Sequence, residues 1–203
     1  MRLSTSFVCA VIAGWVLAGT TPARADVSSS ETMLQSQFAA ANSYWSISKV
    51  ALIVDQTTDD SSEIITALRA LVRAEGWSLI ETALPMNSEG NLNQLQLTKT
   101  MSDLAKQNPQ WLYLGVGQLI DEQRSFIASE AVKHGLPIVA AQDRSVREGH
   151  ALISVKERVL ANGRQDGRSV IINMDVASQL KLFPPLLMMR DAELISRFHG
   201  PRQ

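Results

Sequence analysis

The chain has 203 residues, of which 45% are hydrophobic and 19% charged, and its formal net charge is −1 at pH 7. This balance gives no basic field that would hold nucleic acid or anionic lipid. The one cysteine, Cys9, lies in an N-terminal apolar run, so the rest of the chain has no disulfide or thiol chemistry.

Residues 1–25 have the features of a secretory signal peptide. Arg2 supplies a positive start, 7–17 form an apolar run too short to span a membrane, and Ala23-Arg24-Ala25 is a cleavage motif. The alternative is a retained membrane anchor, which the small and polar residues after the run disfavour. Cleavage leaves 17 basic and 20 acidic residues, a formal charge of −3, and predicts a periplasmic protein.

Residues 26–48 begin rich in serine and continue with weak helical periodicity towards Tyr44 and Trp45. We expect a helix here that packs on the edge of the domain, with a partner-binding helix as the alternative. In the second case, Phe38, Tyr44 and Trp45 would offer an apolar anchor to the partner.

From Lys49 onward, short apolar runs alternate with segments of helical periodicity. The pattern predicts strands at 50–54, 78–84, 111–116, 137–141 and 151–155, helices at 64–76, 95–105 and 120–134, and one helical turn at 146–149. This alternation predicts a single three-layer α/β domain with a mainly parallel sheet in the order 2-1-3-4-5.

The segment between 156 and 168 allows two interpretations. Asn162-Gly163 is a hairpin signal, which would make 159–161 and 170–174 antiparallel partners. The alternative is a frayed helix or loop around 163–167. After this segment we expect a helix that begins near Asp175, a break at Pro184-Pro185 and a last helical turn.

The C-terminal order of strand, Asn173, acidic helix start, di-proline and Leu186-Leu187 resembles the C-terminal signature of periplasmic substrate-binding proteins of ABC transporters. The run Gly135-Leu-Pro-Ile-Val-Ala-Ala-Gln-Asp-Arg-Ser-Val-Arg-Glu-Gly149 and the opening strand at 49–54 are similar to segments of the same family. The resemblance covers about 49–195 and implies that 49–198 form one lobe of such a protein. These proteins trap a ligand between two lobes, whereas this chain has room for one, which cannot close by hinge motion.

A weaker likeness, confined to about 149–195, is to small periplasmic repressors of diguanylate cyclases. The cysteines that many of those proteins carry are absent here. This resemblance implies a periplasmic regulator that docks on a membrane diguanylate cyclase or sensor kinase and has no transport role.

Polar residues follow three of the predicted strands, where an open parallel sheet presents its ligand crevice. They are Asp55, Gln56, Thr57 and Thr58 after the first strand, Gly117 and Gln118 after the third, and Gln142, Asp143 and Arg144 after the fourth. Together they would suit a small polar ligand. The alternative is structural: residues 58–61 would cap a helix and Asp143 would order a turn.

The sequence offers no chemistry for a reaction. His134, His150 and His199 are not at metal-ligand spacing, no cofactor motif is present, and no serine has the elbow motif of a nucleophile. We therefore expect a non-enzymatic binding module without a cofactor, in an ABC-type uptake or sensing system. A membrane protein or a second copy would complete its exposed crevice.

Overall fold

The computed structural model describes residues 29–55, 61–87, 92–159 and 165–196. The predicted signal peptide, Gln56 to Thr58 and the Asn162-Gly163 turn lie outside these ranges. The strands are β1 (Lys49–Val54), β2 (Ser78–Ala83), β3 (Trp111–Leu114), β4 (Ile138–Ala140), β5 (Ile153–Val159), β6 (Gln165–Asn173) and β7 (Glu193–Ile195). The helices are α1 (Ser29–Asn42), α2 (Ser61–Ala74), α3 (Gln94–Lys106), α4 (Gln118–Lys133), α5 (Asp143–Arg147), α6 (Met174–Leu180) and α7 (Leu186–Asp191).

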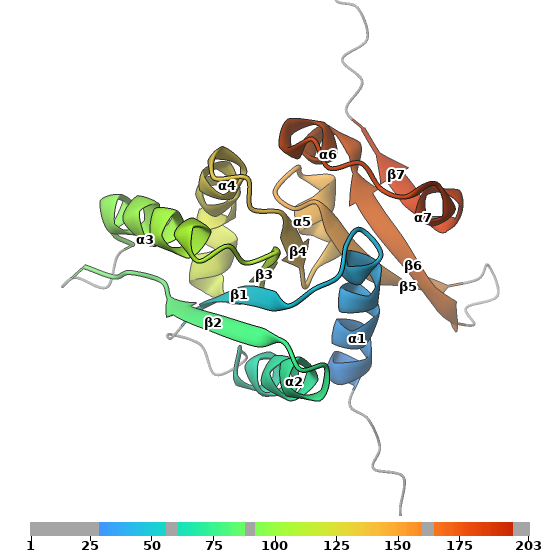
Figure 1. The fold of residues 1–203 in the computed structure, drawn as a ribbon, viewed down its shortest axis with the longest axis horizontal. Helices are drawn as coiled ribbons and strands as arrows, with labels where there is room; N and C mark the ends of the chain where they lie inside the picture. Colours follow the sequence, from blue (N-terminus) through green and yellow to red (C-terminus); the bar gives the residue numbers. More distant parts are fainter. Residues whose placement is uncertain (1–28, 56–60, 88–91, 160–164, 197–203) are drawn as a thin grey trace, which may run out of the picture.

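The strands form one seven-stranded sheet in the order β2-β1-β3-β4-β5-β6-β7 (Figure 1). β2, β1, β3, β4 and β5 run parallel, which confirms the predicted α/β class and the 2-1-3-4-5 order. The strands are parallel because each helix between two strands returns the chain to the end of the sheet at which the previous strand began. The connections between strands and helices can therefore be short.

The C-terminal hairpin was predicted, but its register differs from the prediction. β5 and β6 are antiparallel, and Val155 rather than 159–161 lies opposite Val170. β5 is one continuous strand through Val159, so the fifth strand and the first hairpin strand are the same element. The short edge strand β7, parallel to β6, was not predicted.

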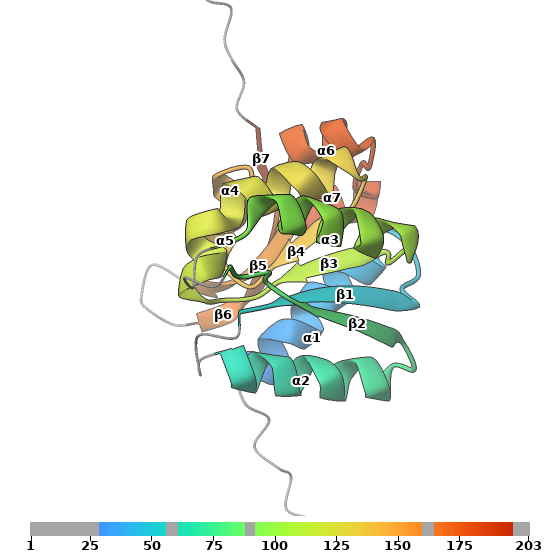
Figure 2. The ribbon, with the colours of Figure 1, turned by 90° about the vertical axis from the view of Figure 1, so that its left-hand side faces the viewer.

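Helices cover both faces of the sheet (Figure 2): α1 and α2 lie on one side, and α3 and α4 on the other. Successive side chains of the parallel strands point to opposite faces of the sheet. In β1, Val50 and Leu52 join the core beneath α1 and α2, whereas Ala51 and Ile53 join the core beneath α3 and α4. Burial on both faces explains why these strands read as unbroken apolar runs.

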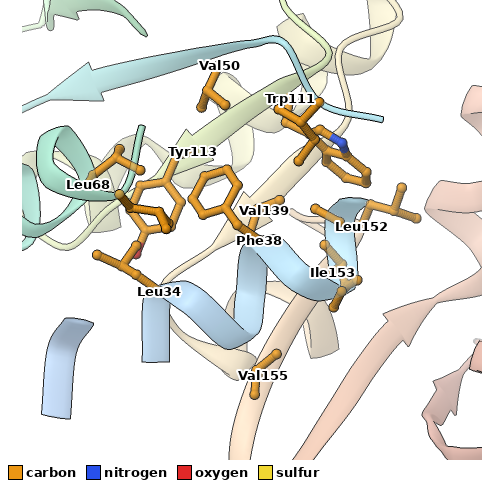
Figure 3. Packing of buried hydrophobic residues seen from close by; sticks show 14 of the residues in the cluster. Leu34, Phe38, Val50, Leu68, Trp111, Tyr113, Val139, Leu152, Ile153 and Val155 are labelled. Carbon is orange, nitrogen blue, oxygen red and sulfur yellow. The ribbon is translucent and has the colours of Figure 1, made fainter. Parts of the chain in front are cut away.

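The sequence led us to expect a helix on the edge of the domain, but α1 does not pack there. It contacts α2 and lies across β4 and β5, and Leu34 and Phe38 are almost fully buried. Figure 3 shows Phe38 beside Tyr113, with ring centroids 5.7 Å apart. Phe38 is therefore a core residue of the α1–α2 face and is not available as an anchor for a partner.

Within the described ranges, no helix combines the length and apolar character needed to cross a membrane.

Candidate functional site

The structure brings two of the predicted site residues together, Asp55 at the end of β1 and Gly117 before α4. The Asp55 carboxylate is fully buried, and its Oδ2 accepts a hydrogen bond of 3.1 Å from the backbone N–H of Leu119. A Cβ atom on Gly117 would lie only 2.6 Å from that oxygen. Asp55 thus satisfies a donor in the first turn of α4, where the helix dipole favours negative charge.

Gln118, the first residue of α4, is exposed, and its Nε2 donates to Glu122 Oε1 at 3.0 Å. The residues after β4 are also largely engaged with their own helix. Gln142 is exposed and precedes α5 without a side-chain cap. Asp143 and Arg144 belong to the helix, although a loop was predicted there.

Asp143 and Arg144 make ion pairs one turn along α5. Asp143 Oδ2 lies 3.0 Å from Arg147 Nε, and Arg144 Nε lies 2.6 Å from Glu148 Oε1. The hydrogen bond from Arg144 lowers the pKa of Glu148. The nearly buried Arg124 of α4 also contacts Glu148, at 3.1 Å. These charges join α5 to α4, so their observed contacts are structural.

A cavity of about 240 Å³ opens at the C-terminal edge of the sheet, on the face that carries α1 and α2. We call it the sheet-edge cavity; it is lined by Ser30, Met33, Gln37, Ile64, Tyr113, Val116, Ala141 and Glu157. Val116 follows β3 and Ala141 follows β4, so the crevice lies at the strand ends where the fold predicts it. None of the predicted site residues within the described ranges lines it.

Gln37 of α1 is one of the polar residues in a lining whose other walls are mainly apolar. Its Nε2 donates to the backbone oxygens of Ala140, at 3.1 Å, and Ala141, at 3.2 Å. Its Oε1 accepts from the hydroxyl of Tyr113 at 3.3 Å. Burial raises the pKa of that hydroxyl, so it remains a neutral donor.

The sequence did not predict the lining residues from α1 and β5, because these elements are far along the chain from the ends of β3 and β4 and come close to them only in the folded domain. Met33, Ile64, Val116 and Ala141 give the cavity apolar walls, and Ser30 and Glu157 add a hydroxyl and a carboxylate. Such a lining suits a small molecule with an apolar body and few polar groups. Among the residues that the structure describes, no cluster of three or more His, Cys, Asp or Glu could hold a metal ion.

No model of a known protein family matches the chain, and no curated protein matches it either. Solved structures do resemble it. A substrate-binding protein with adhesive properties from Clostridium difficile, in its ligand-free open form, superposes with a TM-score of 0.62 at 15% identity, over 82% of this chain and 59% of that one. A conserved domain protein from Vibrio cholerae gives 0.63 at 13% identity, over 84% and 60%.

A third structure, an ABC domain in complex with L-Trp from Streptococcus pneumonia, has a TM-score of 0.63 at 14% identity, over 80% of this chain and 62% of that one. The chain thus spans about 60% of the length of these neighbours. Identities this low establish the fold alone. The chain therefore shares its α/β fold with about 60% of each of these structures, the first of which is a substrate-binding protein.

Proposed function

We propose that this protein is an exported, non-enzymatic binding module that holds a small ligand in the sheet-edge cavity. The observation that carries the proposal is the position of that cavity at the ends of β3 and β4. Open α/β sheets bind their ligands outside the carboxyl ends of the strands. The periplasm is the proposed location, since the first 25 residues resemble a signal peptide.

The size and lining of the cavity favour a ligand no larger than an amino acid. Its volume of about 240 Å³ lies just below the usual range for drug-sized ligands. Apolar walls would hold the body of the ligand, while Ser30 and the rim carboxylate of Glu157 would meet its polar groups. The Streptococcus neighbour contains L-Trp, which makes aromatic amino acids the first class to try.

A role in an ABC-type uptake or sensing system follows from the same proposal. One lobe leaves a bound ligand partly exposed, so affinity would be modest unless another surface covers it. We propose that a membrane protein or a second copy of the chain supplies that surface.

The test is calorimetric titration of the purified protein with L-tryptophan and then with the other amino acids. Ser30→Trp would place an indole at the cavity, whereas Gln35→Trp places the same side chain at an exposed position of α1 that does not line the cavity. We expect binding to survive in Gln35→Trp and to be lost in Ser30→Trp. Equal binding by the two variants, or none by the parent, would count against this function.

A further inference from the structure

A second hollow lies on the other flank of α1, separate from the sheet-edge cavity. This α1–α7 groove has a volume of about 740 Å³ and lies between α1 and α7 over the hairpin. Its apolar lining comes from Ala39, Ala40, Val155, Val170, Leu187 and Met188. The size falls within the range of small-molecule sites.

The serines of the groove do not make it polar. Ser36 Oγ donates to the backbone oxygen of Thr32 at 2.9 Å, and Ser43 Oγ donates to that of Ala39 at 3.0 Å. Both hydroxyl hydrogens are therefore used by the backbone of α1 itself. The groove presents apolar surface along most of the stretch from Ser36 to Ser43, about 10 Å of helix.

Arg168 of β6 places a positive charge at one end of the groove. Its Nη1 donates to Thr32 O at 2.8 Å and to Ser36 Oγ at 2.7 Å, which fixes the guanidinium beside α1. Nε and Nη2 make no hydrogen bond to the described residues. Among the described residues that line the groove, Arg168 is the one charged group. Glu157 lies opposite it in the hairpin register and does not line the groove, although it lines a neighbouring hollow together with Ser36, Gly167 and Arg168.

An apolar groove that runs along a helix and has one fixed cation at its end is complementary to a chain-like molecule with an acidic head. We propose that the α1–α7 groove binds a free single-chain amphipathic carboxylate of the fatty-acid type. The carboxylate would accept hydrogen bonds from Arg168, and the alkyl chain would lie along α1 against Leu187 and Met188. Leu187 lines the groove yet is 77% exposed, and such a chain would cover it.

A membrane surface fits this region less well. The nearby cation Arg190 is paired with Asp191, at 2.9 Å, so the protruding segment offers little net positive charge to anionic lipid. The site also goes beyond the proposed function, since it shares no lining residue with the sheet-edge cavity. Loss of one activity would leave the other measurable.

The first experiment separates the charged head from the apolar chain. Decanoate and its uncharged analogue decanol are titrated calorimetrically into the purified protein, into Arg168→Gln and into Arg168→Lys. We expect Arg168→Gln to weaken decanoate binding about tenfold while decanol binding stays the same, and Arg168→Lys to recover part of the loss. Decanoate binding that is undetectable, or that is unchanged in Arg168→Gln, would overturn the proposal.

The second experiment uses two adjacent leucines. Leu186 and Leu187 are exposed to a similar extent, 80% and 77%, but only Leu187 lines the groove. Leu187→Asp would place a carboxylate against the bound chain and should weaken decanoate binding about tenfold or more, whereas Leu186→Asp should bind like the parent. Equal losses in the two variants would show that decanoate binds the exposed segment as a whole and not the groove, and the groove assignment would be wrong. Circular dichroism of each variant, together with sedimentation of the parent, identifies unfolding or dimerisation.

Discussion

At the scale of single residues, Gln37 connects an N-terminal helix to the centre of the sheet. It is fully buried, yet each polar atom of its amide has a partner on β3 or at the end of β4. A buried amide of this kind stabilises the fold only while its hydrogen bonds are made. If they are lost, its former partners stay buried with no hydrogen bond from protein or water, which costs free energy. Gln37 therefore fixes both the position of α1 and the shape of the sheet-edge cavity.

Replacing Gln37 with Met keeps most of its volume and removes its hydrogen bonds. We expect Gln37→Met to lower the free energy of unfolding by about 2 kcal/mol, because the hydroxyl of Tyr113 and the carbonyl of Ala141 lose a partner. Urea denaturation measures the loss, and Gln35→Met, at an exposed site of α1, should stay within about 0.5 kcal/mol of the parent. Adding Tyr113→Phe to Gln37→Met should recover part of the loss; strictly additive losses would argue against this coupling.

Gly117 fits against the buried carboxylate of Asp55, which gives a second test at this scale. In Gly117→Ala the new methyl group would lie 2.6 Å from Asp55 Oδ2 and 2.8 Å from its Cβ, so the start of α4 must shift. We expect a loss of about 1–3 kcal/mol in thermal or urea unfolding. Gly115→Ala is the matched control, since its Cβ would meet nothing nearer than 4.0 Å. If both variants unfold like the parent, the close approach has no energetic consequence.

At the scale of elements, Glu193 joins the edge strand β7 to α5 and β5. Its carboxylate lies 2.7 Å from Arg147 Nη1 and 2.5 Å from Lys156 Nζ. These hydrogen bonds, first from Arg147 and then from Lys156, lower the pKa of Glu193 to about 2. β7 is short and at the edge, so this cluster is a main attachment of the C-terminal strand.

The lowered pKa predicts how this attachment depends on pH. An unfolded glutamate titrates near 4.3, so the ionised carboxylate stabilises the fold fully above that value and loses its effect as the pH falls towards about 2. We expect Glu193→Gln to cost about 1 kcal/mol at pH 7, because the pair is partly exposed and screened by water. The difference from the parent should shrink between pH 5 and 2 in thermal unfolding curves. A difference that is independent of pH would show that the charge of Glu193 has no part in it.

The parallel strands could be predicted because burial on both faces leaves a direct trace in the sequence. β1, with Val50 to Val54 apolar throughout, is such a case. α1 left no comparable trace: its buried face includes Gln37 and its exposed face includes Ala39, so the apolar periodicity is weak. β7 has three residues, too few for any pattern.

The sheet-edge cavity lies at strand ends where the sequence led us to expect a ligand crevice, but none of the described polar residues named there lines it. The ends of β3 and β4 do border the sheet-edge cavity, through Val116 and Ala141. The polar residues just beyond them, Gln118 and Asp143, instead begin helices and bond within those helices. Polar residues after a strand are suited to helix starts as well as to ligands, and the sequence alone does not separate the two. A ligand contact by these residues stays a prediction.

At the scale of the whole molecule, α1 completes the domain. Leu34, Phe38 and Ala41 share one core with β1, β3 and β5, and the ring of Phe38 also lies 5.8 Å from that of Trp77. Without α1 the face above Tyr113, Val139 and Ile153 would be open to water. Burial of a large apolar side chain contributes about 1.5–3 kcal/mol, whereas a whole domain has about 5–15 kcal/mol of stability.

This balance predicts that the chain from Lys49 onward does not fold by itself. A protein that begins at Asp26 should melt cooperatively, whereas one that begins at Lys49 should show little tertiary structure in near-ultraviolet circular dichroism and poor dispersion of its amide resonances. Phe38→Ala in the longer protein tests the same contact more gently, and we expect it to cost about 3–5 kcal/mol. A cooperative transition of the shorter protein at the parent's melting temperature would mean that 49–198 form an independent lobe and that α1 is an addition to it. If 49–198 fold independently, α1 could detach from the sheet-edge cavity without unfolding the domain. Ligand affinity measured with and without α1 would then show whether the helix forms part of the site or covers it.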